Sequence, residues 1–131
     1  MGWLILPNLS MEELVVSVYR VLSQNDWNDA QAARVVPLCG SDERDGFVHL
    51  SKLEDVVDTA NLYFDESEAP LVIEIDAIAL GSALVWEEVA SRDHKTFPHL
   101  YSPGIPMTAV RATHILEHQA TGFALGPREA R

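Results

Sequence analysis

The feature that most constrains this 131-residue chain is the stretch at positions 45–51, which reads Asp-Gly-Phe-Val-His-Leu-Ser. A turn signal opens it, because Gly46 can adopt a positive φ at no steric cost. The next three residues alternate as in a short strand, which places Phe47 and His49 on the same face. The stretch therefore predicts a histidine at the end of a strand, immediately before the next element.

That next element is predicted to be a helix with Ser51 as its N-cap. Glu54 lies three residues later and completes a Ser-x-x-Glu capping box. The apolar residues that follow recur at helical spacing as far as Phe64. The helix start would bring free N–H groups and the positive end of a helix dipole close to His49, where both favour a phosphate or carboxylate. Capping alone explains Ser51, although a capping hydroxyl can also contact a ligand.

A second stretch, at positions 97–101, reads Phe-Pro-His-Leu-Tyr and is similar in character. Pro98 favours extended geometry in the residue before it. In an extended segment Phe97, His99 and Tyr101 would point the same way, either as a stacking wall for a ring or as a core stripe. His49 has two readings as well: a functional group in a cleft, or a histidine packed at the edge of the core and bonded to a backbone carbonyl.

The remaining pattern predicts an α+β fold, because strands outnumber helices and do not alternate strictly with them. Strands are expected over residues 15–22, 71–75, 84–87, 107–116 and 122–125. Helices are expected from about residue 25, capped by Ser23 and ended by Pro37, and over a turn from Asp76 to Leu80 closed by Gly81. Loops are expected over residues 38–46, 65–70, 90–96 and 102–106, of which 90–96 is expected to be mobile.

Composition excludes some classes of function. Nine Lys and Arg against twenty Asp and Glu give a net charge of −11, which argues against a large nucleic-acid footprint but allows a small anionic ligand. The single cysteine, Cys39, excludes an intramolecular disulfide and favours a reducing cytoplasm. The apolar run at residues 3–6 is too short to span a bilayer, so no signal peptide, transmembrane helix or membrane partner is expected.

Glu87 is a further candidate, because a strand carboxylate could stabilise a developing cation or act as a base, although it could also simply face solvent. Zinc could be held if His49, His99 and Glu87 converged, but no spacing in the sequence demands it, and we predict no metal site. A metal-assisted hydrolase using the two histidines is the weakest of the functional options. Phosphate-binding glycine loops and the Gly-x-Ser-x-Gly nucleophile motif are absent from the sequence.

Taken together, several motifs resemble the domain-of-unknown-function 952 family over about residues 18–127. This places an N-terminal arm at 1–17 and a tail at 128–131 around a single domain. The motifs are Tyr19-Arg20-Val21-Leu22 with Trp27, the stretch at 45–51, Leu84-Val85-Trp86-Glu87 and the stretch at 97–101.

The resemblance implies an ADP-ribosyltransferase-like fold, in which small split β-sheets and a few short helices surround a cleft that holds NAD in active relatives. In those enzymes a strand carries His-x-Ser or His-x-Thr, which His49-Leu50-Ser51 resembles, although Leu50 stands where glycine is common. The resemblance implies that His49 contacts a ribose and that Ser51 supports it. Glu87 is the nearest candidate for the catalytic carboxylate, while His99 or Tyr101 could take an aromatic or third catalytic position.

The leading hypothesis is therefore a domain that binds NAD or another nucleotide and transfers ADP-ribose. His49, His99 and Glu87 are its catalytic candidates. The alternative is a non-catalytic module on the same fold that binds a small molecule or a protein. RNA is disfavoured as a substrate by the negative charge and the few arginines. The oligomeric state is left open. For the leading hypothesis, the candidate cofactor-binding residues are His49, Ser51, Phe47, Phe97 and Tyr101.

Overall fold

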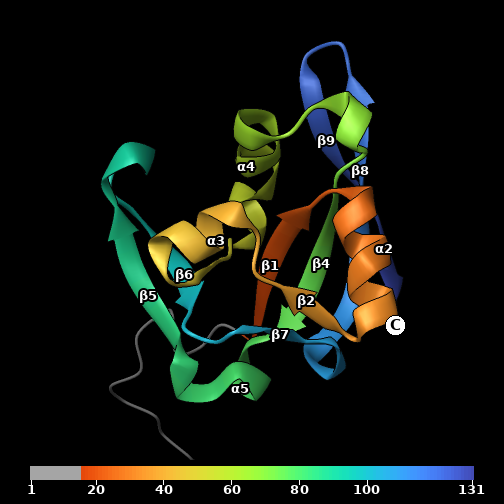
Figure 1. Cartoon of the computed structure of the whole chain (residues 1–131). Coiled ribbons are helices and arrows are strands. Elements are labelled where there is room, and N and C mark those ends of the chain that lie inside the picture. The colour runs from red at the N-terminus through yellow and green to blue at the C-terminus, as the bar shows by residue number, and fades with distance from the viewer. Residues whose placement is uncertain (1–15) are drawn as a thin grey trace, which may run out of the picture.

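A computed structural model describes residues 16–131 and shows an α+β arrangement of small antiparallel sheets and short helices (Figure 1). In this part of the chain the sheets have the strand orders β1-β4-β8-β9, β3-β6-β5 and β2-β7. The strands are β1 (Ser17–Leu22), β2 (Val35–Pro37), β3 (Val48–His49), β4 (Leu71–Asp76), β5 (Leu84–Val89), β6 (Lys95–Leu100), β7 (Gly104–Pro106), β8 (Val110–Gln119) and β9 (Gly122–Ala130). The helices are α2 (Gln24–Ala33), α3 (Gly40–Asp45), α4 (Val56–Tyr63) and α5 (Ala77–Leu80).

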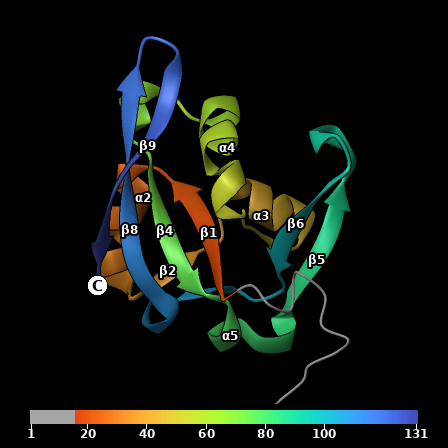
Figure 2. The ribbon, with the colours of Figure 1, turned by 180° about the vertical axis from the view of Figure 1, so that it is seen from behind.

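The four-stranded sheet is covered on both faces. Its strands β1 and β4 are buried on both faces and are therefore mostly apolar, while β8 and β9 are more exposed. On one face, Val18 and Ile73 pack with Trp27 of α2, and on the other, Tyr19 packs with Val56 of α4. Figure 1 views the sheet with α2 in front, and Figure 2 views it from behind. The three-stranded sheet stands beside β1 and contributes Val48 and Leu100 to the larger apolar cluster.

Local signals predicted some elements correctly. Ser23 caps α2, because its Oγ accepts a hydrogen bond from the backbone N–H of Asp26 at 3.1 Å. Asp76 caps α5 in the same way through Ile78, and Gly81 follows its last turn. The strand expected at 71–75 is β4, the central strand beside β1.

The predicted Ser51 cap is wrong. The backbone of Ser51 pairs with β1 instead: its N–H donates to the Tyr19 carbonyl at 2.7 Å, and the N–H of Tyr19 donates to the Ser51 carbonyl at 2.9 Å. A helix N-cap offers its carbonyl and its side-chain oxygen to the N–H groups of the first turn. The Ser51 carbonyl instead accepts from Tyr19, and the Ser51 hydroxyl lies 3.3 Å from that of Thr59. The chain then passes through a 3₁₀ turn at Leu53–Asp55 before α4 begins at Val56.

The loop expected at 38–46 is also wrong, since it contains α3. Asp42 begins this helix by accepting a hydrogen bond from the N–H of Cys39 at 3.0 Å, and Gly46 ends it with a φ of 82°. The preceding helix does not extend to Pro37. It ends at Ala33, followed by Arg34 as its C-cap with a φ of 62°. The next three residues form β2, which pairs with β7 inside another predicted loop, 102–106.

The C-terminal hairpin is longer than the sequence predicted. β8 begins at Val110 rather than 107, after a 3₁₀ turn, and pairs with β9 as far as Ala112 opposite Ala130. Residues 128–130, expected to be part of a tail, therefore continue the sheet. Residues 90–92 form a 3₁₀ turn and β6 begins at Lys95, so the expected loop at 90–96 is shorter.

The N-terminal arm expected at 1–17 lies outside the described residues as far as residue 15, and β1 already includes Ser17. Within residues 16–131, no helix has the length and apolar character needed to cross a membrane.

We expect Gly122→Ala to lower the free energy of unfolding by about 1–3 kcal/mol, because the residue lies at positive φ. Its φ is +120°, and an added Cβ would lie 2.7 Å from Oδ1 of Asn61, the atom that accepts the N–H of Phe123 and ties α4 to β9. Urea unfolding measures the effect. Gly40→Ala is the matched control, because an added Cβ there meets nothing within 4 Å. Equal stability of the two variants would contradict this account.

Candidate functional site

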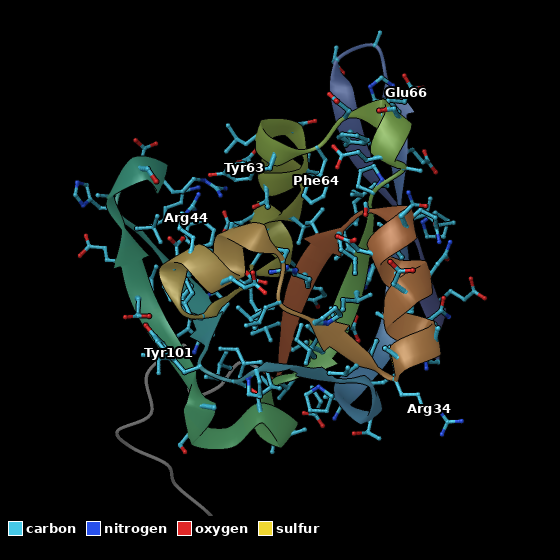
Figure 3. The ribbon with its side chains drawn as sticks, in the orientation of Figure 1. Arg34, Arg44, Tyr63, Phe64, Glu66 and Tyr101 are labelled. Atoms are coloured by element: carbon cyan, nitrogen blue, oxygen red, sulfur yellow. The ribbon has the colours of Figure 1, made fainter. Side chains whose placement is uncertain are left out.

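The candidate site is a cleft of about 540 Å³ between the edge of β1, the helices α3 and α4, and the β5–β6 pair. Its volume is in the range of small-molecule sites. Figure 3 labels Arg44 at the end of α3 nearest β5, and above it Tyr63, the last residue of α4, and Phe64, which follows it. All three line the cleft. The lining residues used below are Arg20, Phe47, His49, Arg92, Phe97 and His99.

His49 lies between two carboxylates. Its Nδ1 is 2.7 Å from Oδ1 of Asp42, and its Nε2 is 2.8 Å from Oδ2 of Asp45. A carboxylate only accepts, so the two hydrogen bonds exist together only when both ring nitrogens carry protons. The inner bond fixes the orientation of the ring. The outer bond, to a residue that lines the cleft, involves the nitrogen that a ligand could reach.

Asp42 is the polar centre of this cluster and its side chain is fully buried. It accepts from both terminal nitrogens of Arg20, at 3.1 and 2.8 Å, and from the backbone N–H groups of Cys39 and His49, each at 3.0 Å. Arg20 also donates to the His49 carbonyl at 2.8 Å. One ion pair therefore connects β1, α3 and β3 at the base of the cleft.

The two aspartates are held in the ionised form for different reasons. Burial raises the pKa of Asp42, but hydrogen bonds from His49 and Arg20 outweigh burial and hold that pKa far below the usual carboxyl range. The hydrogen bond from Arg44 is the largest influence on Asp45 and lowers its pKa to about 2. His49 thus has a carboxylate on each side at neutral pH.

The second histidine is directly opposite the first across two strands. His99 of β6 pairs with His49 of β3, so both side chains point to the same face. Phe47 stacks on His99 with ring centroids 3.9 Å apart and an interplanar angle of 18°. Phe97 lies two residues before His99 and lines the cleft with it.

Glu87 and Tyr101 support His99 from outside the cleft lining. Oε1 of Glu87 is 2.8 Å from Nδ1 of His99 and accepts the Tyr101 hydroxyl at 2.6 Å. Tyr101, followed by His99, lowers the pKa of Glu87. Neither Glu87 nor Tyr101 lines the cleft, so the contact of Glu87 with the site is its hydrogen bond to His99.

The structure thus brings five of the seven predicted site residues to the cleft lining, namely His49, His99, Phe47, Phe97 and Ser51. The hydroxyl of Ser51 lies 3.3 Å from that of Thr59 on α4.

Sequence reasoning missed Arg20, Asp42, Asp45 and Arg92. One signal was available: in a buried strand Arg20 shares a face with Val18 and Leu22, so its charge needs a buried partner. No comparable signal marks the partner, Asp42, in what reads as a polar loop.

The two histidines and Glu87 do not form a metal centre. Across residues 16–131 no group of three or more His, Cys, Asp or Glu side chains is placed to hold a metal ion. Glu87 and Asp45 each bond a different histidine.

Comparisons with known proteins identify the family. The family model described as "Protein of unknown function (DUF952)" matches residues 21–113. The chain belongs to this family. The DUF952 match begins one residue after Arg20 and includes the other lining residues of the cleft, from Val21 to His99.

Solved structures of one protein have the same fold as this DUF952 chain. The crystal structure of protein CC0527 from Caulobacter crescentus is 31% identical, with a TM-score of 0.73 over 82% of this chain and 91% of that one. Its solution NMR structure gives 31% identity and a TM-score of 0.68, covering 82% and 90%. Both are structural-genomics targets. Among proteins with curated descriptions, none matches.

We expect Asp42→Asn to lower the free energy of unfolding by about 3–5 kcal/mol, because it leaves the buried Arg20 guanidinium without a counter-charge. Urea unfolding at pH 7 measures the loss. Asp29→Asn, on the exposed face of α2, is the control and should stay within about 0.5 kcal/mol of the wild type. A loss in Asp42→Asn no larger than that of the control would show that the ion pair does not hold the fold together.

The stability difference between the wild type and Asp42→Asn should also depend on pH. The pKa of Asp42 is lower in the folded protein than in the unfolded chain, so protonation favours unfolding. Its contribution is fully present above about pH 5 and declines as the pH falls below the ordinary carboxyl pKa of about 3.9. The stability difference between the wild type and Asp42→Asn should therefore shrink between pH 5 and pH 3 in urea titrations. A constant difference would contradict the assignment.

Proposed function

We propose that this DUF952 domain binds NAD or a related nucleotide in the cleft and transfers the ADP-ribosyl group. The observation that supports this best is the pairing of His49 with His99 across neighbouring strands, inside a nucleotide-sized cleft with aromatic side chains. Such a site offers imidazole N–H donors for hydroxyl groups and flat apolar surfaces for a heterocyclic ring. The placement of the cleft beside split small sheets is the basis for proposing an ADP-ribosyltransferase-like fold.

In the proposed complex, His49 and Asp45 bind the ribose. A pair of ribose hydroxyls can accept from Nε2–H of His49 and donate to the Asp45 carboxylate, and so replace the 2.8 Å bond between these two side chains. The hydrogen bond that Nδ1–H of His49 donates to Asp42 keeps the ring in place during this exchange. The hydroxyls of Ser51 and Thr59 stand on the α4 side of the same cleft.

In the proposed transfer, the bond between C1′ of the ribose and the nicotinamide nitrogen breaks, and its electron pair leaves with nicotinamide. Water or an acceptor group forms the new bond to C1′ and gives up its proton to solvent. Positive charge develops on the sugar, so a carboxylate near C1′ lowers the barrier. Asp45 suits this role better than Glu87, because Asp45 lines the cleft and Glu87 acts through His99.

A non-catalytic binding module is the second candidate. The observation that favours it is the position of Glu87, the predicted catalytic carboxylate, outside the cleft lining. In this case the cleft holds a nucleotide or another small molecule and leaves it unchanged. The single cysteine agrees with a reducing cytoplasm as the place of either function.

Ligand-observed NMR with NAD, ADP-ribose and nicotinamide tests the binding. We expect saturable NAD binding that weakens at least about tenfold in His49→Ala, because the ribose loses the hydrogen bond from Nε2–H of His49. His94→Asn is the control, since His94 is exposed and lies outside the cleft lining. The ¹H–¹⁵N spectrum of each variant reports whether it is folded. Wild-type protein that binds neither NAD nor ADP-ribose would refute the proposal.

Turnover separates the two candidates. Transfer predicts that free nicotinamide accumulates in ¹H spectra of NAD incubated with the wild type and that the rate falls in Asp45→Asn. A binding module predicts intact NAD at the end of the incubation, with binding still dependent on His49.

A further inference from the structure

Three guanidinium groups in the described part of the chain line the cleft, and they differ in what neutralises them. Arg20 is paired with buried Asp42, and Arg44 is paired with Asp45 at 2.9 Å. Arg92, in the turn between β5 and β6, forms no ion pair with any carboxylate of residues 16–131. Two of the three positive charges are therefore balanced within the protein, and the third is not.

Arg92 is nevertheless held in place. Its two terminal nitrogens donate to the hydroxyl of Thr59 on α4, at 3.3 and 3.4 Å, and its guanidinium lies over the Phe97 ring, 4.6 Å from the centroid. The side chain is half-buried. Thr59 occupies the edge between the two terminal nitrogens. The edge formed by Nε–H and the outer N–H of the adjacent terminal nitrogen remains for an oxyanion in a fork.

Among the arginines that line the cleft, Arg92 alone has this arrangement. The protein carries a net charge of −11, so an arginine at its surface has many carboxylates available as partners. A guanidinium that points into a cleft, fixed by a hydroxyl and a ring rather than by a carboxylate, leaves its charge for a ligand. The hydroxyls of Ser51, Thr59 and Ser91 line the cleft with it and add neutral donors.

We propose that Arg92 is the anchor for the phosphate or pyrophosphate group of the cleft's ligand. It binds the oxyanion in a bidentate manner on the α4 side, while His49 and Asp45 contact the sugar on the α3 side. This rests on the proposed function and deepens it, because it names the ligand class as phosphorylated: nucleotides and dinucleotides are bound, and nucleosides without phosphate are bound weakly.

Isothermal titration with ADP, adenosine and inorganic pyrophosphate tests the anchor in wild type, Arg92→Gln and Arg92→Lys. We expect Arg92→Gln to weaken ADP and pyrophosphate about tenfold to a hundredfold, because charge-assisted hydrogen bonds are lost. Adenosine should bind the wild type and Arg92→Gln equally. Arg92→Lys should retain part of the affinity, because it keeps the charge but loses the fork.

Arg34→Gln is the matched control. It removes the same charge at the end of α2, far from Arg44 in Figure 3, and Arg34 does not line the cleft. A loss of affinity that is equal in Arg34→Gln and Arg92→Gln would mean a general effect of net charge and would overturn the anchor. A wild-type protein that binds neither pyrophosphate nor ADP would also overturn the proposal of Arg92 as anchor.

The outcomes also separate this inference from the proposed function. If NAD binds through His49 but Arg92→Gln binds it as tightly as the wild type, the anchor fails and the proposed function stands. If pyrophosphate binds through Arg92 but NAD does not bind, the anchor stands and the proposed function fails. If Arg92→Gln and Arg34→Gln have the same melting temperature, unfolding is excluded as the cause of the lost affinity.

Discussion

The buried pair of Arg20 and Asp42 is the interaction on which the rest of the site depends. It joins the four-stranded sheet to α3, and the same two side chains reach the backbone of His49 in the three-stranded sheet. Buried charges are costly unless they are fully bonded, and Asp42 meets this condition with donors from three separate segments. The ion pair therefore sets where the two sheets meet, and the cleft is the space left beside that junction.

The residues with strong local patterns could be predicted from the sequence. Alternation in two short stretches was enough to place Phe47 with His49, and Phe97 with His99, and the structure brings both pairs to one cleft. Ser23 and Asp76 correctly predict the helices that follow them, because each cap hydrogen bond involves a residue only two or three positions away. In these cases the physical cause lies within the segment itself.

The elements that the sequence did not predict depend on partners far along the chain. Ser51 carries a strong capping signal, but its backbone bonds to Tyr19, more than thirty residues earlier. The helix α3 forms in a segment rich in charge and glycine because Asp42 accepts a hydrogen bond in its first turn and is itself held by Arg20. Glu87 was placed on the correct strand, but whether its carboxylate faces the cleft depends on the neighbouring side chains of His99 and Tyr101.

The shortness of β3 has a consequence for how chains of this kind can differ in length. Two residues, Val48 and His49, form the whole strand, and side chains in a strand alternate between its faces. One residue inserted between Gly46 and Ser51 would turn His49 toward the core and Val48 toward the cleft, and would move Phe47 away from His99. The turn between β8 and β9 contributes no residue to the cleft lining. The length of the β8–β9 hairpin can therefore vary, while the number of residues between Gly46 and Ser51 has to stay constant.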